Sequence, residues 1–120
     1  MSELKIAVSR SCPDCFTSQR SIVNIDETNF IDVAAVVLSV EDIEKGKLDE
    51  INATGYGIPV FIATESAERV PAAWLPRISG VFEHNEARTE FYGRQLETAA
   101  SHYETQLRPP FFSALVDYVK

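Results

Sequence analysis

Long apolar runs and basic residues are both scarce in this sequence of 120 residues. No run approaches the roughly 20 consecutive apolar residues that a membrane-spanning helix requires. The 11 Lys and Arg residues are outnumbered by 18 Asp and Glu residues, which gives a formal net charge of −7. Because nucleic acids and anionic membrane surfaces bind concentrated positive charge, we expect neither as a partner.

A secretory signal is also missing from the first residues. Met1 to Lys5 lead into only a few apolar residues, without the long hydrophobic region and the small-residue cleavage site of such a signal. A reducing cytoplasm is therefore the expected location.

The overall composition is that of an ordinary globular domain. Hydrophobic residues make up 45% of the chain and charged residues 24%, values typical of folded proteins rather than of disordered ones. A chain of this length buries one core without disulfides or a structural metal. We therefore expect residues 1–120 to form a single domain.

Cysteines are few as well, and the only two, Cys12 and Cys15, form a Cys-x-x-Cys motif. In a reducing compartment, such a pair is more often catalytic, redox-sensing or metal-binding than a permanent disulfide. A zinc site would need two further ligands, and the only histidines, His84 and His102, show no ligand spacing. The motif therefore favours thiol chemistry, and no metal site is expected.

Hydrophobic periodicity and turn residues predict an alternation of strands and helices. Apolar or β-branched runs indicate strands at residues 4–9, 30–39, 58–63 and 80–84. Apolar spacing and capping residues indicate helices over residues 13–25, from 39 or 41 to the glycines at 55 and 57, over 85–107 and over 111–119. Residues 65–79 are predicted to form a loop with one short turn. The opening order of strand, helix, strand and helix is typical of a parallel βαβ unit.

Two motifs in this framework resemble those of the thioredoxin-fold superfamily, and of its glutaredoxin branch in particular. They are the Cys-x-x-Cys motif at residues 12–15, after the first strand, and Ile58-Pro59 at the start of the third. The resemblance covers about residues 3–64. It implies an α/β thioredoxin-like fold, with a central mixed sheet of about four strands flanked by helices. It also implies a cis-proline loop at Pro59 that faces the cysteines.

This resemblance implies a thiol-disulfide oxidoreductase that reduces protein or glutathione mixed disulfides. A helix that begins at the motif would place Cys12 where free backbone donors and the helix dipole stabilise a thiolate, so Cys12 is the expected nucleophile. Cys15, one turn further along, is the expected resolving thiol. Four further residues are expected to bind the substrate: Arg10, which would hold the glutathione carboxylate, Pro13, Ile58 and Pro59.

No tightly bound cofactor is expected, and glutathione is the expected co-substrate. The expected partners are disulfide-containing proteins and, as electron donor, either glutathione or a thioredoxin-type reductase. Two alternatives stay open, namely a thioredoxin-like disulfide reductase independent of glutathione and a non-catalytic interaction or redox-sensing module. A cluster-carrying role with glutathione is a weaker option, because such proteins usually replace the resolving cysteine.

Overall fold

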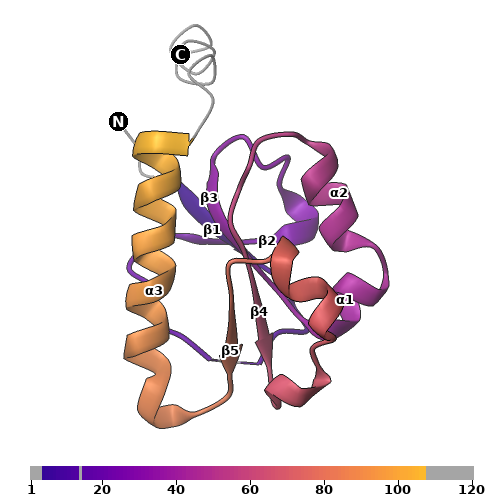
Figure 1. Cartoon of the computed structure of the whole chain (residues 1–120). Coiled ribbons are helices and arrows are strands. Elements are labelled where there is room, and N and C mark those ends of the chain that lie inside the picture. The colour runs from indigo at the N-terminus through magenta and orange to yellow at the C-terminus, as the bar shows by residue number, and fades with distance from the viewer. Residues whose placement is uncertain (1–3, 14, 108–120) are drawn as a thin grey trace, which may run out of the picture.

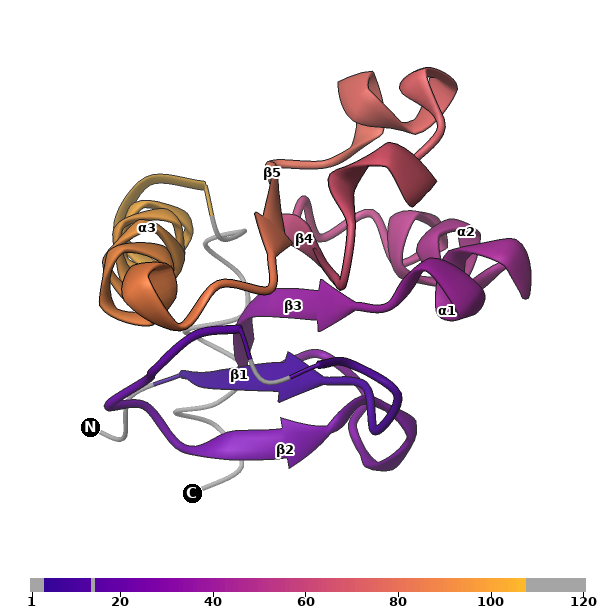
Figure 2. The ribbon, with the colours of Figure 1, turned by 90° about the horizontal axis from the view of Figure 1, so that it is seen from below.

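The computed structural model describes residues 4–13 and 15–107. Within them, five strands form one sheet in the order β2-β1-β3-β4-β5, and Figure 2 shows the strands stacked in this order. The strands are β1 (Lys5–Val8), β2 (Ile22–Asn24), β3 (Val33–Leu38), β4 (Val60–Thr64) and β5 (Gly80–Glu83). Every pairing in this sheet is parallel. The α/β class is thus confirmed, but the expected mixed, thioredoxin-like sheet is wrong, because this is the flavodoxin-like strand order.

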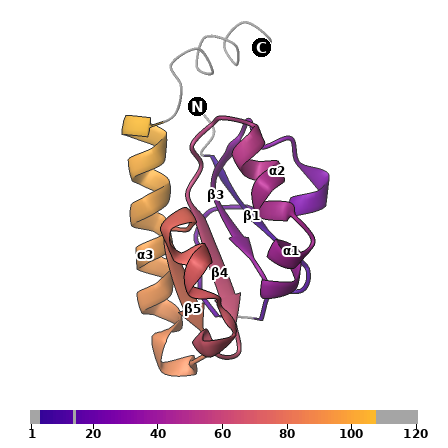
Figure 3. The same cartoon turned by 45° about the vertical axis from the view of Figure 1, so that its right-hand side comes forward.

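Helices lie on both sides of the sheet. The helices α1 (Val40–Glu44) and α2 (Lys47–Ala53) follow β3, and α3 (Thr89–His102) follows β5. Figures 1 and 3 show α3 on one side of the sheet and α1 and α2 on the other. The described residues also form short turns: 3₁₀ turns at Ile25–Glu27, Ala67–Arg69, Ala72–Arg77 and Glu86–Arg88, and a π turn at Tyr103–Leu107 that continues α3.

Most of the predicted elements are confirmed, with shorter bounds. Each of the four predicted strands corresponds to a strand of the sheet, and the predicted long helix near the C-terminus is α3 with its flanking turns. The helix predicted after residue 39 is two helices, because Gly46 between them adopts a left-handed φ of +88° that favours glycine. The helix predicted over residues 111–119 lies outside the described residues.

The helix predicted over residues 13–25 is wrong. The described residues between β1 and β2 form no helix, and β2 begins at Ile22, inside the predicted range. This segment crosses from β1 to β2 as an irregular chain that packs against α3 and the sheet. Cys15 is fully buried, and the ring centroid of Phe16 lies 5.8 Å from that of Phe82.

A glycine allows α3 to approach this irregular crossover. The Thr17 amide donates to the Thr89 carbonyl oxygen at 3.3 Å, at the start of α3. One turn further along the helix, a Cβ placed on Gly93 would lie 2.4 Å from the Thr17 carbonyl oxygen. Any side chain there would push the helix away, because real Cβ atoms do not come so close to an oxygen.

Arg20 fixes the end of the crossover to α3 and to the start of β1. Its side chain is only 4% exposed. The guanidinium donates to both carboxylate oxygens of Glu97 at 2.8 Å, to Glu104 at 3.3 Å and to the Leu4 carbonyl oxygen at 2.9 Å. A buried cation is tolerated only when it is paired and hydrogen-bonded in this way. The hydrogen bond from Arg20 lowers the pKa of the Glu97 carboxyl below its ordinary value.

We predict that Arg20→Gln lowers the free energy of unfolding by about 3 kcal/mol, the loss typical of breaking a buried ion pair. The substitution should also make the free energy of unfolding depend less on pH in the acid range. Because the pKa of Glu97 is lowered in the folded state, its contribution to the free energy of unfolding is fully present above the ordinary glutamate pKa of 4.5. That contribution is lost as the pH falls through the lowered folded value.

Urea unfolding at pH 7, 5 and 3 measures both effects. The control is Arg10→Gln, because Arg10 pairs with Glu27 at 3.2 Å on the surface, where its side chain is 79% exposed. Such exposed pairs contribute about 0–1 kcal/mol. Equal losses in the two variants, or the same pH dependence, would contradict the role assigned to Arg20.

Candidate functional site

Polar side chains gather where β1 and β3 end. In an open parallel sheet, ligands bind outside the carboxyl ends of the strands, at the point where the strand order reverses. In this sheet that point lies between β1 and β3. Residues 9–12 follow β1 and residues 39–42 follow β3, so both segments lie at this position.

Three serines and one carboxylate join these two segments. The Ser11 hydroxyl oxygen lies 3.0 Å from that of Ser9 and 2.7 Å from that of Ser39. The Ser39 hydroxyl and backbone amide donate to Asp42 at 2.7 and 2.9 Å, in a capping box that begins α1. Burial alone would raise the pKa of Asp42, but hydrogen bonds from these serines outweigh it and lower that pKa.

A small pocket of about 230 Å³ lies beside this network. Its walls come from the ends of β1, β3 and β4 and from the turn after β4, at Ser11, Cys12, Pro13, Ser39, Val40, Glu41, Ala63, Thr64, Glu65 and Arg69. Arg69 and Glu41 form an ion pair of 3.1 Å between two of these walls. Sequence reasoning missed the serine network, although the pattern of Ser39 followed three residues later by Asp42 is a signal of a helix start.

The two cysteines lie in different surroundings. Cys12 is partly buried, and its Sγ donates to the Val37 carbonyl oxygen at 3.5 Å. Burial, followed by the negative charge of Asp42, raises the pKa of the Cys12 thiol to about 12. Cys15 is fully buried in the core, and neither thiol is in a disulfide. Because the described residues show no helix that begins at the motif, they supply no helix dipole to stabilise a thiolate at Cys12.

The other predicted site residues are only partly brought together. Pro13 lines the same pocket as Cys12, whereas the exposed Arg10 side chain points to Glu27 instead. Ile58 is buried, and the Pro59 carbonyl accepts a hydrogen bond from the Val36 amide at 2.9 Å.

The expected cis bond before Pro59 is wrong, since the described residues contain no cis peptide bond. The pocket that Cys12 lines also contains Ala63, Thr64 and Glu65, at and just after the end of β4, and Pro59 is not among its lining residues. A binding role for these residues stays a prediction.

The chemistry that the described groups offer at this edge is hydrogen bonding. The serine hydroxyls and the carboxylate of Asp42 donate and accept hydrogen bonds, but the nearby thiol stays protonated near neutral pH. In the part of the chain that the structure describes, no three His, Cys, Asp or Glu side chains are placed to hold a metal ion. No helix among the same residues is long and apolar enough to cross a membrane.

We predict that Cys12 is alkylated slowly at neutral pH, because almost none of a thiol with a pKa of about 12 is ionised there. The rate with iodoacetamide should rise about tenfold per pH unit between about pH 7 and pH 10 without a plateau. Peptide mass spectrometry resolves Cys12 from Cys15, and Cys15→Ser is the control. A plateau with a midpoint between about pH 6 and pH 9 would show a reactive thiolate and contradict this assignment.

Comparison with known proteins relates the chain to the N-terminal domains of decarboxylases. Residues 4–103 match the family described as Orn/Lys/Arg decarboxylase, N-terminal domain. The chain is 77% identical over 119 residues to an inducible ornithine decarboxylase of Escherichia coli K12. It is 40% identical over 120 residues to an ornithine decarboxylase of Haemophilus influenzae, and 35% identical over 119 residues to an inducible ornithine decarboxylase of Lactobacillus sp. 30a. These matches cover 98–100% of this chain but only 16% of each relative.

These matches overturn the redox interpretation. The thioredoxin and glutaredoxin resemblance is wrong, because the related proteins are decarboxylases, which are lyases, and not oxidoreductases. The expected thiol-disulfide exchange, glutathione co-substrate, disulfide-containing substrates and thioredoxin-type reductase are wrong with it. Since the family match spans residues 4–103, the chain belongs to the family of Orn/Lys/Arg decarboxylase N-terminal domains.

Proposed function

We propose that this chain is the N-terminal domain of an ornithine decarboxylase and that it contributes no reacting group of its own. The observation that carries the proposal is the 77% identity to the Escherichia coli inducible ornithine decarboxylase, which extends over 99% of this chain. The chain spans about 16% of the length of the curated relatives that it matches. The decarboxylase activity would therefore belong to a longer polypeptide.

The relatives favour ornithine over the other two amino acids in the family description. All three relatives compared above carry ornithine decarboxylase as their name, at identities from 35% to 77%. An amino acid with a shorter side chain than lysine or arginine is thus the proposed substrate.

The described lysines do not fit the cofactor that such a reaction calls for. Decarboxylation of an amino acid leaves a carbanion, for which pyridoxal phosphate, held by a lysine, is the usual electron sink. Lys47 is paired with Asp26 and Glu50, and these hydrogen bonds raise its pKa although its burial opposes the shift. An amine with a raised pKa is a poor nucleophile near neutral pH.

The other two described lysines are no better placed. Lys5 pairs with Asp32 and lines a pocket that also contains Glu27, and these carboxylates would repel the phosphate of the cofactor. Lys45 is exposed and lines neither the pocket beside Cys12 nor the pocket that contains Lys5. The cofactor would therefore be held by another part of the longer polypeptide.

The domain is thus proposed to have a structural role in the longer polypeptide and not a catalytic one. Its polar edge carries a hydrogen-bonded network without an ionised nucleophile, and its sheet is a self-contained core built around β3, whose six side chains are all buried. That residues 1–120 form one domain, and that the protein is cytoplasmic, stay predictions.

We predict that the longer polypeptide carrying this domain releases carbon dioxide from L-ornithine, and much more slowly from L-lysine or L-arginine. The 120-residue chain alone should neither turn over ornithine nor retain pyridoxal phosphate after dialysis, because none of its described lysines is suitable. Carbon dioxide release and cofactor absorbance measure the two outcomes, with the Escherichia coli enzyme as the positive control. Turnover by the isolated chain, or a preference of the longer protein for lysine or arginine, would refute the proposal.

A further inference from the structure

The connection from β4 to β5, residues 65–79, is long and lies at the surface. None of its residues is buried, although the two strands that it joins both contribute to the core. Its regular pieces are short, namely the 3₁₀ turns at Ala67–Arg69 and Ala72–Arg77. Connections of this length without a longer helix or strand are uncommon in compact domains, and they are often functional. We call residues 65–79 the strap.

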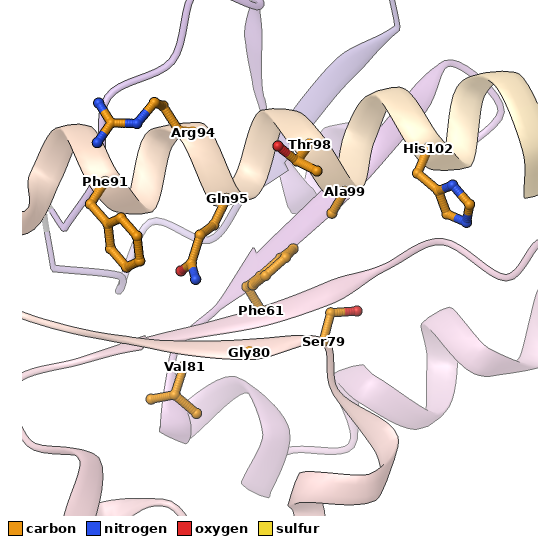
Figure 4. Close-up of a pocket in the computed structure, with 10 residues that line it drawn as sticks. All are labelled: Phe61, Ser79, Gly80, Val81, Phe91, Arg94, Gln95, Thr98, Ala99 and His102. Carbon is orange, nitrogen blue, oxygen red and sulfur yellow. The ribbon is translucent and has the colours of Figure 1, made fainter.

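Both ends of the strap are fixed to the sheet. It begins directly after Thr64, the last residue of β4. At its other end, the Ser79 amide donates to the Val60 carbonyl oxygen at 2.7 Å. A Cβ placed on the next residue, Gly80, would lie 3.1 Å from two ring carbons of Phe61, and Figure 4 shows Ser79 and Gly80 beside this ring. Any opening of the strap is therefore confined to the residues between these two ends.

Between these ends, the apolar contacts of the strap are partial. Val70, Trp74 and Ile78 pack against the core but stay partly exposed, and Leu75 is 50% exposed. The backbone hydrogen bonds that close its turns lie within the strap, such as the one from the Trp74 amide to the Pro71 carbonyl oxygen at 3.0 Å. Few buried contacts and exposed hydrogen bonds are typical of segments that open without unfolding of the whole domain.

Two ion pairs tie the strap to the helices beside it. Arg69 pairs with Glu41 of α1 at 3.1 Å, and Arg77 pairs with Asp49 of α2. Figure 2 shows the strap on the same side of the sheet as these two helices. The four side chains are between 44% and 74% exposed. Each pair is therefore weak, and salt screens both of them.

One of these ion pairs lies at the pocket beside Cys12. Glu65 and Arg69 of the strap line this pocket, whereas its other lining residues belong to β4, to the start of α1 and to the segment after β1. Because Glu41 also lines the pocket, the pair that it forms with Arg69 joins two of the walls. Movement of the strap away from α1 would remove one wall and widen the access to Cys12.

We propose that the strap is a lid over the pocket beside Cys12, and that it opens as a unit while the sheet stays folded. The ion pairs of Arg69 and Arg77 hold the closed position, and high salt favours the open one because it screens them. Opening leaves β4 and β5 paired, since their pairing begins at Gly80, after the strap. Access to Cys12 thus depends on the pair between Arg77 and Asp49, which lies outside the pocket. The lid involves this domain alone and does not depend on the proposed function.

Urea unfolding of the 120-residue chain tests whether the strap opens as a unit. Trp74 is the only tryptophan of the chain and lies in the strap, so its fluorescence reports opening, whereas far-ultraviolet circular dichroism reports the helices and the sheet. We expect the fluorescence to change at a lower urea concentration than the circular dichroism. The gap between the two midpoints should widen from about 0.1 M to about 1 M NaCl, because the screening length falls from about 10 Å to about 3 Å. Coincident transitions at both salt concentrations would overturn the proposal.

Alkylation of Cys12 tests whether the strap covers the pocket. Arg77 does not line the pocket, so Arg77→Gln loosens the strap without changing a charged group of its lining. We expect Cys12 to react with iodoacetamide at about pH 9 about threefold faster in this variant, the factor expected from the loss of one exposed ion pair. Asp49→Asn removes the same pair from its other side and should give the same increase. Peptide mass spectrometry follows Cys12 separately from Cys15.

The matched control for both variants is Lys5→Gln. It removes the ion pair with Asp32, whose side chains are 41% and 50% exposed and which lies outside the strap. The alkylation rate of Cys12 should be the same in this variant as in the unchanged chain. An unchanged rate in Arg77→Gln and Asp49→Asn would overturn the lid. An equal increase in Lys5→Gln would also overturn it, because the domain would then loosen as a whole.

Discussion

The buried guanidinium of Arg20 is the contact on which the arrangement of the first crossover depends. A chain that leaves β1 and returns as the parallel strand β2 must cross a face of the sheet, and such crossovers usually contain a helix. Here the described crossover has no helical hydrogen bonds of its own, so its position comes from tertiary contacts. Arg20 supplies them at one end by pairing with Glu97 and Glu104 on α3 and with the Leu4 carbonyl oxygen. The close contact of Gly93 with Thr17 supplies them in the middle.

This irregular crossover also leaves the cysteine motif without the helix end that was expected to stabilise a thiolate. Cys12 follows β1 without a helix whose amide end could stabilise negative charge. Burial and the neighbouring carboxylate of Asp42 both favour the protonated thiol instead. The polar groups that do meet at this edge are serine hydroxyls, which are already engaged with Asp42 and with one another. These hydrogen bonds therefore connect the segment after β1 to the start of α1.

Much of the fold is predictable from the sequence, because its signals are local. The six buried side chains of β3 form a continuous β-branched and apolar run, and the spacing of Tyr92, Leu96 and Tyr103 marks the inner face of α3 and of the π turn that continues it. The segment after Pro13 also carries helix signals. They are overridden by the close packing of Gly93 against Thr17 and by the hydrogen bonds from Arg20 to α3 and the turn after it. Those contacts join residues more than 70 positions apart, which no local pattern reveals. The thiolate expected at Cys12 depended on a helix beginning at the motif, and the described residues of the motif form no helix.

The claim central to this account is that the chain returns from β1 directly into a parallel β2 rather than into a helix. Nuclear Overhauser effects between backbone protons measure this most directly. The account predicts contacts between Ile6 and Ile22 and between Val8 and Asn24, in the parallel register of the sheet. Successive amide-to-amide contacts of a helix through residues 15–25, without contacts between these strands, would contradict it.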